Sequence, residues 1–434
     1  MTLSLHFCAV TALLCCFPLH SSAETRTVSP QGSDTAAGSR EHPWKTLARA
    51  TRDLKAGDTL VVRAGVYHER LNLEASGSPE AGFITIKGEP GAVITGAGSP
   101  GKNLVLIENQ SYIRITGLEL NGLKGVRDGS GIRITGHGSH LELRNNRIHD
   151  IRGRDAMGIT VYGTSPARPL EKIIIDGNEV YDCEPAHSEA LTLNGNVADF
   201  EVTNNVVHDV NNIGIDFIGG EASICSDRTK VARNGVCRGN KVWRCRSHYE
   251  GGYAAGIYVD GGQDIVVEDN LVTECDLGLE VGAENKGVAS SGITVRGNTL
   301  FHNDKAGIVF GGFERGAGRV RQCRFHNNIC YQNNRHAKDQ NGELWIQWAA
   351  DNEISGNTFV TDGDGPLVQM DEGGVTGNLL KNNRYYTPGG SAEAPFMWRD
   401  KDITGLASWQ RASGQDADST FGAVEVALPV LGTK

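Results

Sequence analysis

The chain is poor in aromatic residues, in proline and in clusters of positive charge. Of its 434 residues, 6% are aromatic and 13 are proline, whereas glycine reaches 56. This balance is unlike that of a globular α/β enzyme and is typical of many short strands joined by tight turns. The formal net charge is −10 and no Lys/Arg cluster is present, which argues against a nucleic-acid partner.

Long apolar runs are also missing, apart from one near the start. Residues Phe7 to Leu19 are apolar, and Ser21-Ser22-Ala23 supplies small residues before a cleavage site near Glu24. This pattern predicts a signal peptide over residues 1–23, and the run is too short for a membrane span. We therefore expect a secreted or periplasmic protein with no membrane span.

The cysteines lack the spacing of a zinc motif. Ten are present, and three of them leave with the predicted signal peptide, so seven remain and at least one thiol is unpaired in a monomer. Cys225 and Cys237 bracket one insertion and could close it as a disulfide in an oxidising compartment. Cys183, Cys245 and Cys275 take equivalent places in the repeat described below, which predicts stacked core cysteines, with a Cys245–Cys275 disulfide as the alternative.

The strongest pattern that is present is a repeat marked by asparagine, in steps of 27 to 35 residues. The marker positions are Asn146, Asn178, Asn205, Asn240, Asn270, Asn298, Asn328 and Asn357. A fixed period near 30 with short strands and no intervening helices is typical of a β-solenoid. Asparagine tolerates the left-handed φ of a sharp turn, and its amide can bond the next coil about 4.8 Å away, so these residues predict a ladder within the scaffold.

A second strand of each repeat alternates strictly between apolar and other residues. In Ile215-Asp-Phe-Ile, Ile257-Tyr-Val-Asp and Leu279-Glu-Val-Gly, the first and third residues point inside and the second and fourth outside. We predict one parallel β-helix domain over residues 24–434, with an N-terminal cap over about 24–60 and a closing segment over about 385–434. Helical spacing in Pro43–Leu54 and Thr404–Gly414 predicts short capping helices, and a capped solenoid predicts a monomer.

Three segments near the start and one near the end carry a family resemblance. They are Val28-Ser-Pro-Gln-Gly-Ser-Asp, Pro43-Trp-Lys-Thr-Leu, Gly57-Asp-Thr-Leu-Val-Val-Arg-Ala-Gly-Val-Tyr and Trp409-Gln-Arg-Ala-Ser-Gly-Gln-Asp-Ala-Asp-Ser. They resemble bacterial right-handed parallel β-helix proteins of the pectate-lyase-like superfamily. That resemblance implies a right-handed helix, while the fold itself hosts lyases, hydrolases, epimerases and adhesins. The chain shows neither the paired-Asp calcium motif with a catalytic Lys of related pectate lyases nor the Tyr-Gly-x-Asp-Pro-His-Asp signature of alginate epimerases, so no catalytic residues transfer from those families.

Three carboxylates fall on outward positions of successive repeats: Asp216, Asp260 and Glu280. No basic residue stands between them in the two outward columns. Like charges facing each other across strands are destabilising, and packing them together raises a carboxyl pKa or demands a cation. We interpret the cluster as a candidate site, against the alternative of a solvated acidic strip screened by salt.

Other side chains on or beside this face extend the candidate site. Aromatic rings suited to sugar faces are Tyr162, Tyr258, Trp345 and Trp348. Asn194 and Glu189 are further candidates for substrate binding, and Glu189 interrupts an apolar column. His187 is an acid/base candidate, and Lys286 and Arg315, in equivalent loops, are expected to stack one coil apart and could capture a substrate carboxylate.

These residues leave three functions open, and the first two make the chain an enzyme acting on a polysaccharide. The slightly favoured one is a lyase on a uronate polymer, in which Asp216, Asp260, Glu280 and Glu284 hold calcium, Lys286, Tyr258 or His187 is the base, and Arg315 holds the substrate. The second is a glycoside hydrolase that uses two carboxylates from the same cluster. The third is a non-catalytic glycan-binding protein on the same scaffold.

Overall fold

The computed structural model describes residues 23–98, 101–185, 187–249, 251–314, 316–335, 341–373, 375–428 and 431. The predicted signal peptide, apart from Ala23, and the predicted substrate ligand Arg315 lie outside the described residues. Within the described part, no helix is both long and apolar enough to cross a bilayer.

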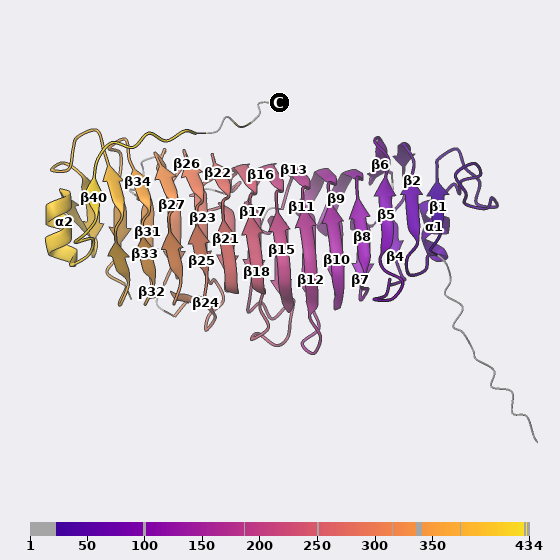
Figure 1. Cartoon of the computed structure of the whole chain (residues 1–434), viewed down its shortest axis with the longest axis horizontal. Coiled ribbons are helices and arrows are strands. Elements are labelled where there is room, and N and C mark those ends of the chain that lie inside the picture. The colour runs from indigo at the N-terminus through magenta and orange to yellow at the C-terminus, as the bar shows by residue number, and fades with distance from the viewer. Residues whose placement is uncertain are drawn as a thin grey trace, which may run out of the picture.

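The described chain winds into a parallel β-helix of about eleven turns, which confirms the predicted fold class. Its long axis runs from the indigo N-terminal end to the yellow C-terminal end in Figure 1. Each coil contributes short strands to three faces, and each strand pairs in parallel with its counterparts one coil before and after.

The first face is one continuous parallel ladder. Its strands are β1 (Thr25–Val28), β2 (Thr59–Val62), β5 (Ile84–Gly88), β8 (Ile113–Thr116), β10 (Gly138–Arg144), β12 (Leu170–Asp176), β15 (Val197–Thr203), β18 (Arg233–Arg238), β21 (Gln263–Glu268), β25 (Thr294–Arg296), β29 (Arg324–His326), β33 (Glu353–Ser355) and β36 (Leu379–Lys381). Short strands at its side are β24 (Ala289–Ser291), β28 (Arg319–Arg321) and β32 (Ala349–Ala350). Because β1 and β2 already pair, the ladder begins inside the segment predicted as the N-terminal cap.

The second and third faces share two long strands that run through both, β9 (Glu119–Thr135) and β11 (Arg147–Gly163). The second face also holds β3 (Gly65–Tyr67), β6 (Ala92–Thr95), β13 (Glu179–Cys183), β16 (Val206–Val210), β19 (Lys241–Cys245), β22 (Leu271–Thr273), β26 (Thr299–Phe301), β30 (Ile329–Tyr331), β34 (Thr358–Val360), β37 (Arg384–Tyr386) and β40 (Thr420–Phe421). The third face also holds β4 (Leu71–Leu73), β7 (Asn103–Glu108), β14 (Glu189–Gly195), β17 (Ile213–Ile218), β20 (Ala255–Asp260), β23 (Leu277–Gly282), β27 (Ala306–Gly311), β31 (Leu344–Gln347), β35 (Val368–Met370) and β38 (Pro395–Trp398), the last of which pairs with the antiparallel β39 (Lys401–Thr404).

Two short helices stand at the ends of the solenoid (Figure 1). Helix α1 (Leu47–Arg52) buries Leu47 and Ala50, and Thr46 caps it by accepting a hydrogen bond from the Arg49 N–H. Helix α2 (Leu406–Ser413) buries Leu406 and Trp409 against the last coils. Both helices fall within the segments whose spacing predicted them, and they cover strand edges that would otherwise be open.

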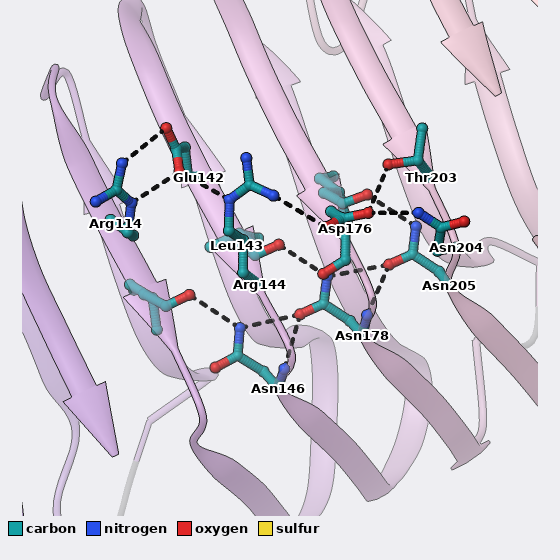
Figure 2. Close-up of polar contacts among 12 residues, drawn as sticks. Arg114, Glu142, Leu143, Arg144, Asn146, Asp176, Asn178, Thr203, Asn204 and Asn205 are labelled. Atoms are coloured by element: carbon teal, nitrogen blue, oxygen red, sulfur yellow. Dashed lines mark hydrogen bonds and ion pairs between the residues drawn. The ribbon is translucent and has the colours of Figure 1, made fainter. Parts of the chain in front are cut away.

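The predicted asparagine ladder is confirmed, and Asn383 extends it by one coil. Each side-chain amide donates to the Oδ1 of the ladder asparagine one coil on, over 2.9–3.2 Å. The same Oδ1 accepts the backbone N–H of the preceding ladder residue, and the Nδ2 also reaches a main-chain carbonyl of an earlier coil, as Asn146, Asn178 and Asn205 show in Figure 2. These buried amides therefore have partners for both their donors and their acceptor.

The left-handed backbone lies one residue earlier than predicted. Positive φ falls on the residue before each ladder asparagine, for example Asn145 at 53°, Asn204 at 54° and Asp269 at 54°. Glycine takes that position before Asn178, Asn240, Asn298 and Asn357. The ladder asparagine itself does not need a left-handed backbone, so its recurring role in the repeat is hydrogen bonding.

The ladder ends on a carboxylate. Asn383 Nδ2 donates to Asp416 Oδ1 over 3.0 Å, and Asp416 Oδ2 accepts hydrogen bonds from Tyr385 and from the Trp409 indole of α2. Both oxygens of this buried carboxyl group therefore have hydrogen-bond partners. The closing helix thus attaches to the same polar column that runs through the coils.

Outside the core, the first face carries a row of alternating charges. Arg114 and Arg144 both donate to Glu142, and Arg144 also donates to Asp176 on the next strand over 2.9 Å (Figure 2). These hydrogen bonds hold the pKa of Glu142 below its usual value even though partial burial opposes the shift. The row follows the axis because outward positions repeat once per coil.

The seven cysteines that were predicted to remain are buried free thiols, so the two disulfides considered from the sequence are not formed. Cys183, Cys245 and Cys275 lie in the core as the stacked-cysteine interpretation predicts. Burial raises the pKa of the Cys183 thiol to about 12, which keeps it protonated and unreactive at neutral pH.

We predict that Asn270→Ala lowers the free energy of unfolding by about 3–5 kcal/mol. The change leaves two donors of Asn240 without their acceptor, and each buried donor without a partner costs about 1–3 kcal/mol. Urea denaturation followed by circular dichroism measures the loss. Asn72→Ala, at an exposed position of β4, is the control and should change stability little; equal losses in both variants would contradict the ladder's role.

Candidate functional site

The register of the third face places the predicted acidic residues close together. Asp216 on β17 pairs with Tyr258 on β20, and Tyr258 pairs with Glu280 on β23, so the three form one outward column on successive coils. Asp260 belongs to the neighbouring column, where it pairs with Gly282. The two columns therefore bring Asp216, Asp260 and Glu280 onto one patch, as the alignment of repeats predicted.

A cavity of about 430 Å³ opens on this patch. Its lining residues are Ile213, Tyr249, Tyr253, Tyr258, Leu277, Glu280, Ala283, Glu284, Val309, Gly311, Phe313, Trp345 and Gln347. The floor is a small apolar cluster, separate from the main core, in which Tyr258, Leu277 and Val309 pack together. The acids of the lining are thus Glu280 and Glu284, set on an apolar floor.

Three further carboxylates stand beside the cavity and are almost fully buried. Burial, with the charges of nearby carboxylates, raises the pKa of Glu189 and of Asp260 to about 8. The same two causes raise the pKa of Asp216 well above its usual value, although the Phe217 N–H donates to it over 2.6 Å. Groups with such pKa values are largely protonated at neutral pH, which relieves the repulsion in the cluster.

The two acids of the cavity differ in environment. Burial, with Glu284 and Asp260 nearby, raises the pKa of Glu280 well above its usual value, and a hydrogen bond with Tyr258 opposes the shift. Desolvation within the cavity and the charge of Glu221 raise the pKa of Glu284 as well, although its side chain is partly open to solvent. Asp260 Oδ1 accepts the Glu284 N–H over 2.6 Å and so fixes the backbone of that residue.

A glycine on the neighbouring strand makes room for the Tyr258 ring at this site. A Cβ on Gly282, on the next coil, would lie 2.8 Å from the Tyr258 hydroxyl, so only glycine leaves room for the ring at this place. Burial and the surrounding carboxylates raise the pKa of Tyr258 well above its usual value. The hydroxyl therefore keeps its proton and can donate it in a hydrogen bond to Glu280.

Basic groups predicted at the site are not part of the described cavity. Within the described lining there is no Lys or Arg. Lys286 is exposed, its carbonyl accepts a hydrogen bond from Arg228, and its Cε lies 3.9 Å from where a Cβ on Gly316 would stand. It therefore leans toward the following loop, at Gly316.

The remaining predicted residues surround the cavity at different places. His187 is exposed and packs with the rings of His248 and Tyr249, at 5.6 and 6.2 Å between centroids, rather than with the carboxylates. Trp345 lines the cavity and donates its indole N–H to Asp371 over 3.0 Å. Trp348 has a φ of 44° and packs near Gly373, away from the lining.

Tyr162 and Asn194 lie on coils toward the N-terminus, beyond the cavity. The Tyr162 ring stacks with Arg133 at 5.2 Å, and its hydroxyl contacts the Met157 sulfur. Asn194 donates to Glu221 over 2.6 Å, while its buried Oδ1 has no hydrogen-bond partner. Both residues extend the polar face rather than line the cavity itself.

Sequence reasoning missed four residues of the site: Glu221, Tyr249, Tyr253 and Phe313. All four belong to loops whose positions the repeat does not define. The three aromatic residues are exposed by 41%, 47% and 63%, respectively, in a chain that has few aromatics. The sequence feature that could have indicated them is their position in the insertions next to the third-face strands.

The predicted calcium ligands Asp216, Asp260, Glu280 and Glu284 offer only oxygen donors, which suits calcium chemically. Across the described residues, however, no three His, Cys, Asp or Glu side chains converge in a way that could hold a metal ion. A calcium requirement therefore stays a prediction, and no step below is routed through a metal.

Comparison with known proteins identifies the fold and the family. A family model described as the right-handed β-helix region matches residues 202–359. The uncharacterized protein YwoF of Bacillus subtilis (strain 168) is 32% identical over 411 residues, which cover 91% of this chain and 86% of that protein. The chain belongs to the YwoF family of right-handed β-helix proteins. Its resemblance to the pectate-lyase-like superfamily is thereby confirmed.

Two further similarities lie outside the YwoF family. Pectate lyase PEL9 of Emericella nidulans is 31% identical over 190 residues, which cover 39% of this chain and 45% of that protein. The structure of GH136 lacto-N-biosidase from Eubacterium ramulus matches with a TM-score of 0.63 at 16% identity, over 83% of this chain and 67% of that chain. At that identity the match shows a shared fold.

We predict that stability falls as pH rises from 5 to 9. Glu189 and Asp260 have pKa values raised to about 8 in the folded state, so their stabilising contribution is complete below the unfolded values near 4 and is lost as pH rises through 8. Urea midpoints measured across this range should show the decline, and Asp260→Asn should flatten it. Asp227→Asn, at a surface carboxylate whose pKa is lowered, should leave the slope unchanged; the same slope in wild type and Asp260→Asn would refute the assignment.

Proposed function

We propose that the chain is a glycoside hydrolase acting on an uncharged glycan, with Glu280 as general acid and Glu284 as the base or nucleophile. The observation that carries the proposal is the pair of carboxyl groups, Glu280 and Glu284, that line one cavity beside an apolar cluster, with no Lys or Arg in the described lining. Glycoside hydrolysis needs one carboxyl that donates a proton to the leaving oxygen and one carboxylate on the other side of the reaction.

The environments of the two acids assign their roles. Burial, with the charges of Glu284 and Asp260, raises the pKa of Glu280 well above its usual value, which favours the protonated form that a general acid needs. Glu284 lines the same cavity and is the carboxyl left to act as the base or nucleophile. Tyr258 orients Glu280 through its hydrogen bond, and Asp260 orients Glu284 through the backbone N–H.

The charge of the site favours an uncharged substrate. A uronate polymer would bring its negative charge beside the base Glu284, into a cavity whose described lining holds no Lys or Arg to neutralise it. The apolar floor and the rings at the cavity suit the C–H faces of neutral sugars. We further propose that the protein acts outside the cytoplasm, after removal of residues 1–23, and as a monomer.

A lyase is the second candidate, supported by the partial similarity to pectate lyase PEL9. A lyase requires a positive charge that neutralises the substrate carboxylate. Calcium would have to supply this charge, held by Asp216, Asp260, Glu280 and Glu284, or else Lys286 and Arg315 would. Tyr258 or His187 would then be the base. The raised pKa of Tyr258 works against its use as a base, and this is why the hydrolase is preferred.

We predict that the purified chain releases reducing ends from a neutral polysaccharide without generating an unsaturated product. The assay follows reducing ends and ultraviolet absorbance together, on neutral and uronate-containing polysaccharides, with and without a chelator. Activity on neutral substrates that survives the chelator is the expected result, since protonation of Glu280 needs no metal. Absorbance that rises with reducing ends on a uronate polymer and disappears with the chelator would instead establish the calcium-dependent lyase.

We predict that Glu280→Gln and Glu284→Gln each lower kcat by about 10²–10⁴-fold, the usual contribution of an acid or base, while the fold is retained. Steady-state kinetics on the substrate found in the preceding assay measure the decrease in kcat. If Glu280→Gln keeps residual activity and its rate no longer falls at alkaline pH, the alkaline limb of the wild-type pH profile is assigned to Glu280. Asp227→Asn, at the exposed carboxylate of the stability experiment, is the matched control. Full activity in Glu280→Gln would remove Glu280 from the mechanism.

A further inference from the structure

We propose that Tyr249 and Tyr253 form a preorganised subsite that binds the apolar face of a neutral pyranose next to the acid pair, and that Asp276 is the positioning residue that holds it. This inference rests on the proposed function for the identity of the ligand. It goes beyond that function because it assigns substrate binding to a loop that the catalytic roles do not involve.

The two rings are exposed where a ligand can reach them. Tyr249 and Tyr253 are 41% and 47% exposed, although both line the cavity that contains Glu280 and Glu284. Large aromatic side chains exposed together mark a binding surface more often than plain surface. Because the rings and the acids share one cavity, the ligand that covers the rings is the one that meets the acids.

A single carboxylate closes the loop that carries these rings. Asp276 Oδ2 accepts the N–H of Ser247 and the N–H of Ala254, each over 2.9 Å, so it binds the loop at both ends. The Ser247 hydroxyl also accepts the Tyr253 N–H over 3.1 Å. Asp276 itself is 6% exposed and comes from the following coil, between β22 and β23.

Further contacts fix the loop to the coil after that one. Arg246 makes a bidentate pair with Asp304, over 2.6 and 3.0 Å. The Lys305 ammonium lies 4.6 Å from the centroid of the Tyr253 ring, in a cation–π contact. His187, from the loop between β13 and β14 two coils earlier, packs beside Tyr249.

These contacts explain why exposed rings are held in place. A loop anchored by two carboxylates and a cation–π contact loses little conformational freedom on binding, which favours affinity. Nothing in the packing of the core requires this arrangement, since both rings stand outside the core cluster. The ring faces offer stacking to sugar C–H groups, and the described lining has no Lys or Arg that would pair with an anionic sugar.

The test measures binding apart from catalysis, in the full chain carrying Glu280→Gln. Calorimetric titration uses neutral hexasaccharides of glucose, xylose, mannose and galactose, with hexagalacturonate as the acidic probe. We expect at least one neutral hexasaccharide to bind and hexagalacturonate to bind more weakly. Tyr253→Ala and Tyr249→Ala should each weaken that binding by about tenfold, in line with the loss of one aromatic contact. Leu379→Ala, at an apolar residue on the first face that is also 47% exposed, is the matched control and should bind as the parent does.

Asp276 is tested by rescue. Asp276→Ala removes the acceptor for both N–H groups and should weaken binding as the Tyr variants do, whereas Asp276→Asn keeps an acceptor oxygen and should restore most of it. In the otherwise wild-type chain, the substitutions that weaken binding should raise KM and leave kcat nearly unchanged. Binding that does not depend on Tyr249 or Tyr253, or no binding of any neutral hexasaccharide, would overturn the subsite. Binding that depends on both rings in a chain without hydrolytic activity would keep the subsite and reject the proposed function.

Discussion

The hydrogen bond between one asparagine side chain and the next, repeated along the axis, is the interaction on which the rest of the structure depends. Each Oδ1 receives two donors from the preceding ladder residue, and each Nδ2 reaches two acceptors. A shift of register by one residue would break these bonds in the buried core, where no water replaces them. The ladder therefore fixes which residue faces which on every face, including the face that carries the site.

The candidate site is a direct result of that register. Strands about 4.8 Å apart put Asp216, Tyr258 and Glu280 in contact along one column, whatever their mutual repulsion. The rest of the scaffold offsets the stability that is lost by placing these groups together. Their burial and mutual charges raise the pKa values of the carboxyl groups, which favours the protonated forms. A fold that positions side chains by backbone pairing is thus suited to acid–base chemistry, because it can impose neighbours that free side chains would avoid.

Sequence alone predicted what the repeat controls and missed what the loops control. The asparagine period and the alternation of the second strand predicted the solenoid, the columns and the gathering of Asp216, Asp260 and Glu280, since all of these follow from period-two strands stacked in register. Glu221, Tyr249, Tyr253 and Phe313 were beyond this reasoning, because their positions depend on the fold of insertions and on contacts such as Asp276 with Ser247 and Ala254. Lys286 is an example of a residue that was predicted at the site and is not there. The alignment of repeats placed it beside the carboxylates, but the fold of its loop directs the side chain toward Gly316.

The carboxylate at the end of the ladder has a consequence for how such a chain can change in length. Every bond from one ladder side chain to the next runs in the same direction, with the donor on the N-terminal side, so any coil placed between two others receives and passes on the same bonds. Asp416 only accepts, and Trp409 and Tyr385 occupy its second oxygen, so no further asparagine coil can follow it without rebuilding the terminus. The solenoid can therefore gain or lose whole coils by duplication or deletion within its middle, while its closing end stays the same in long and short descendants.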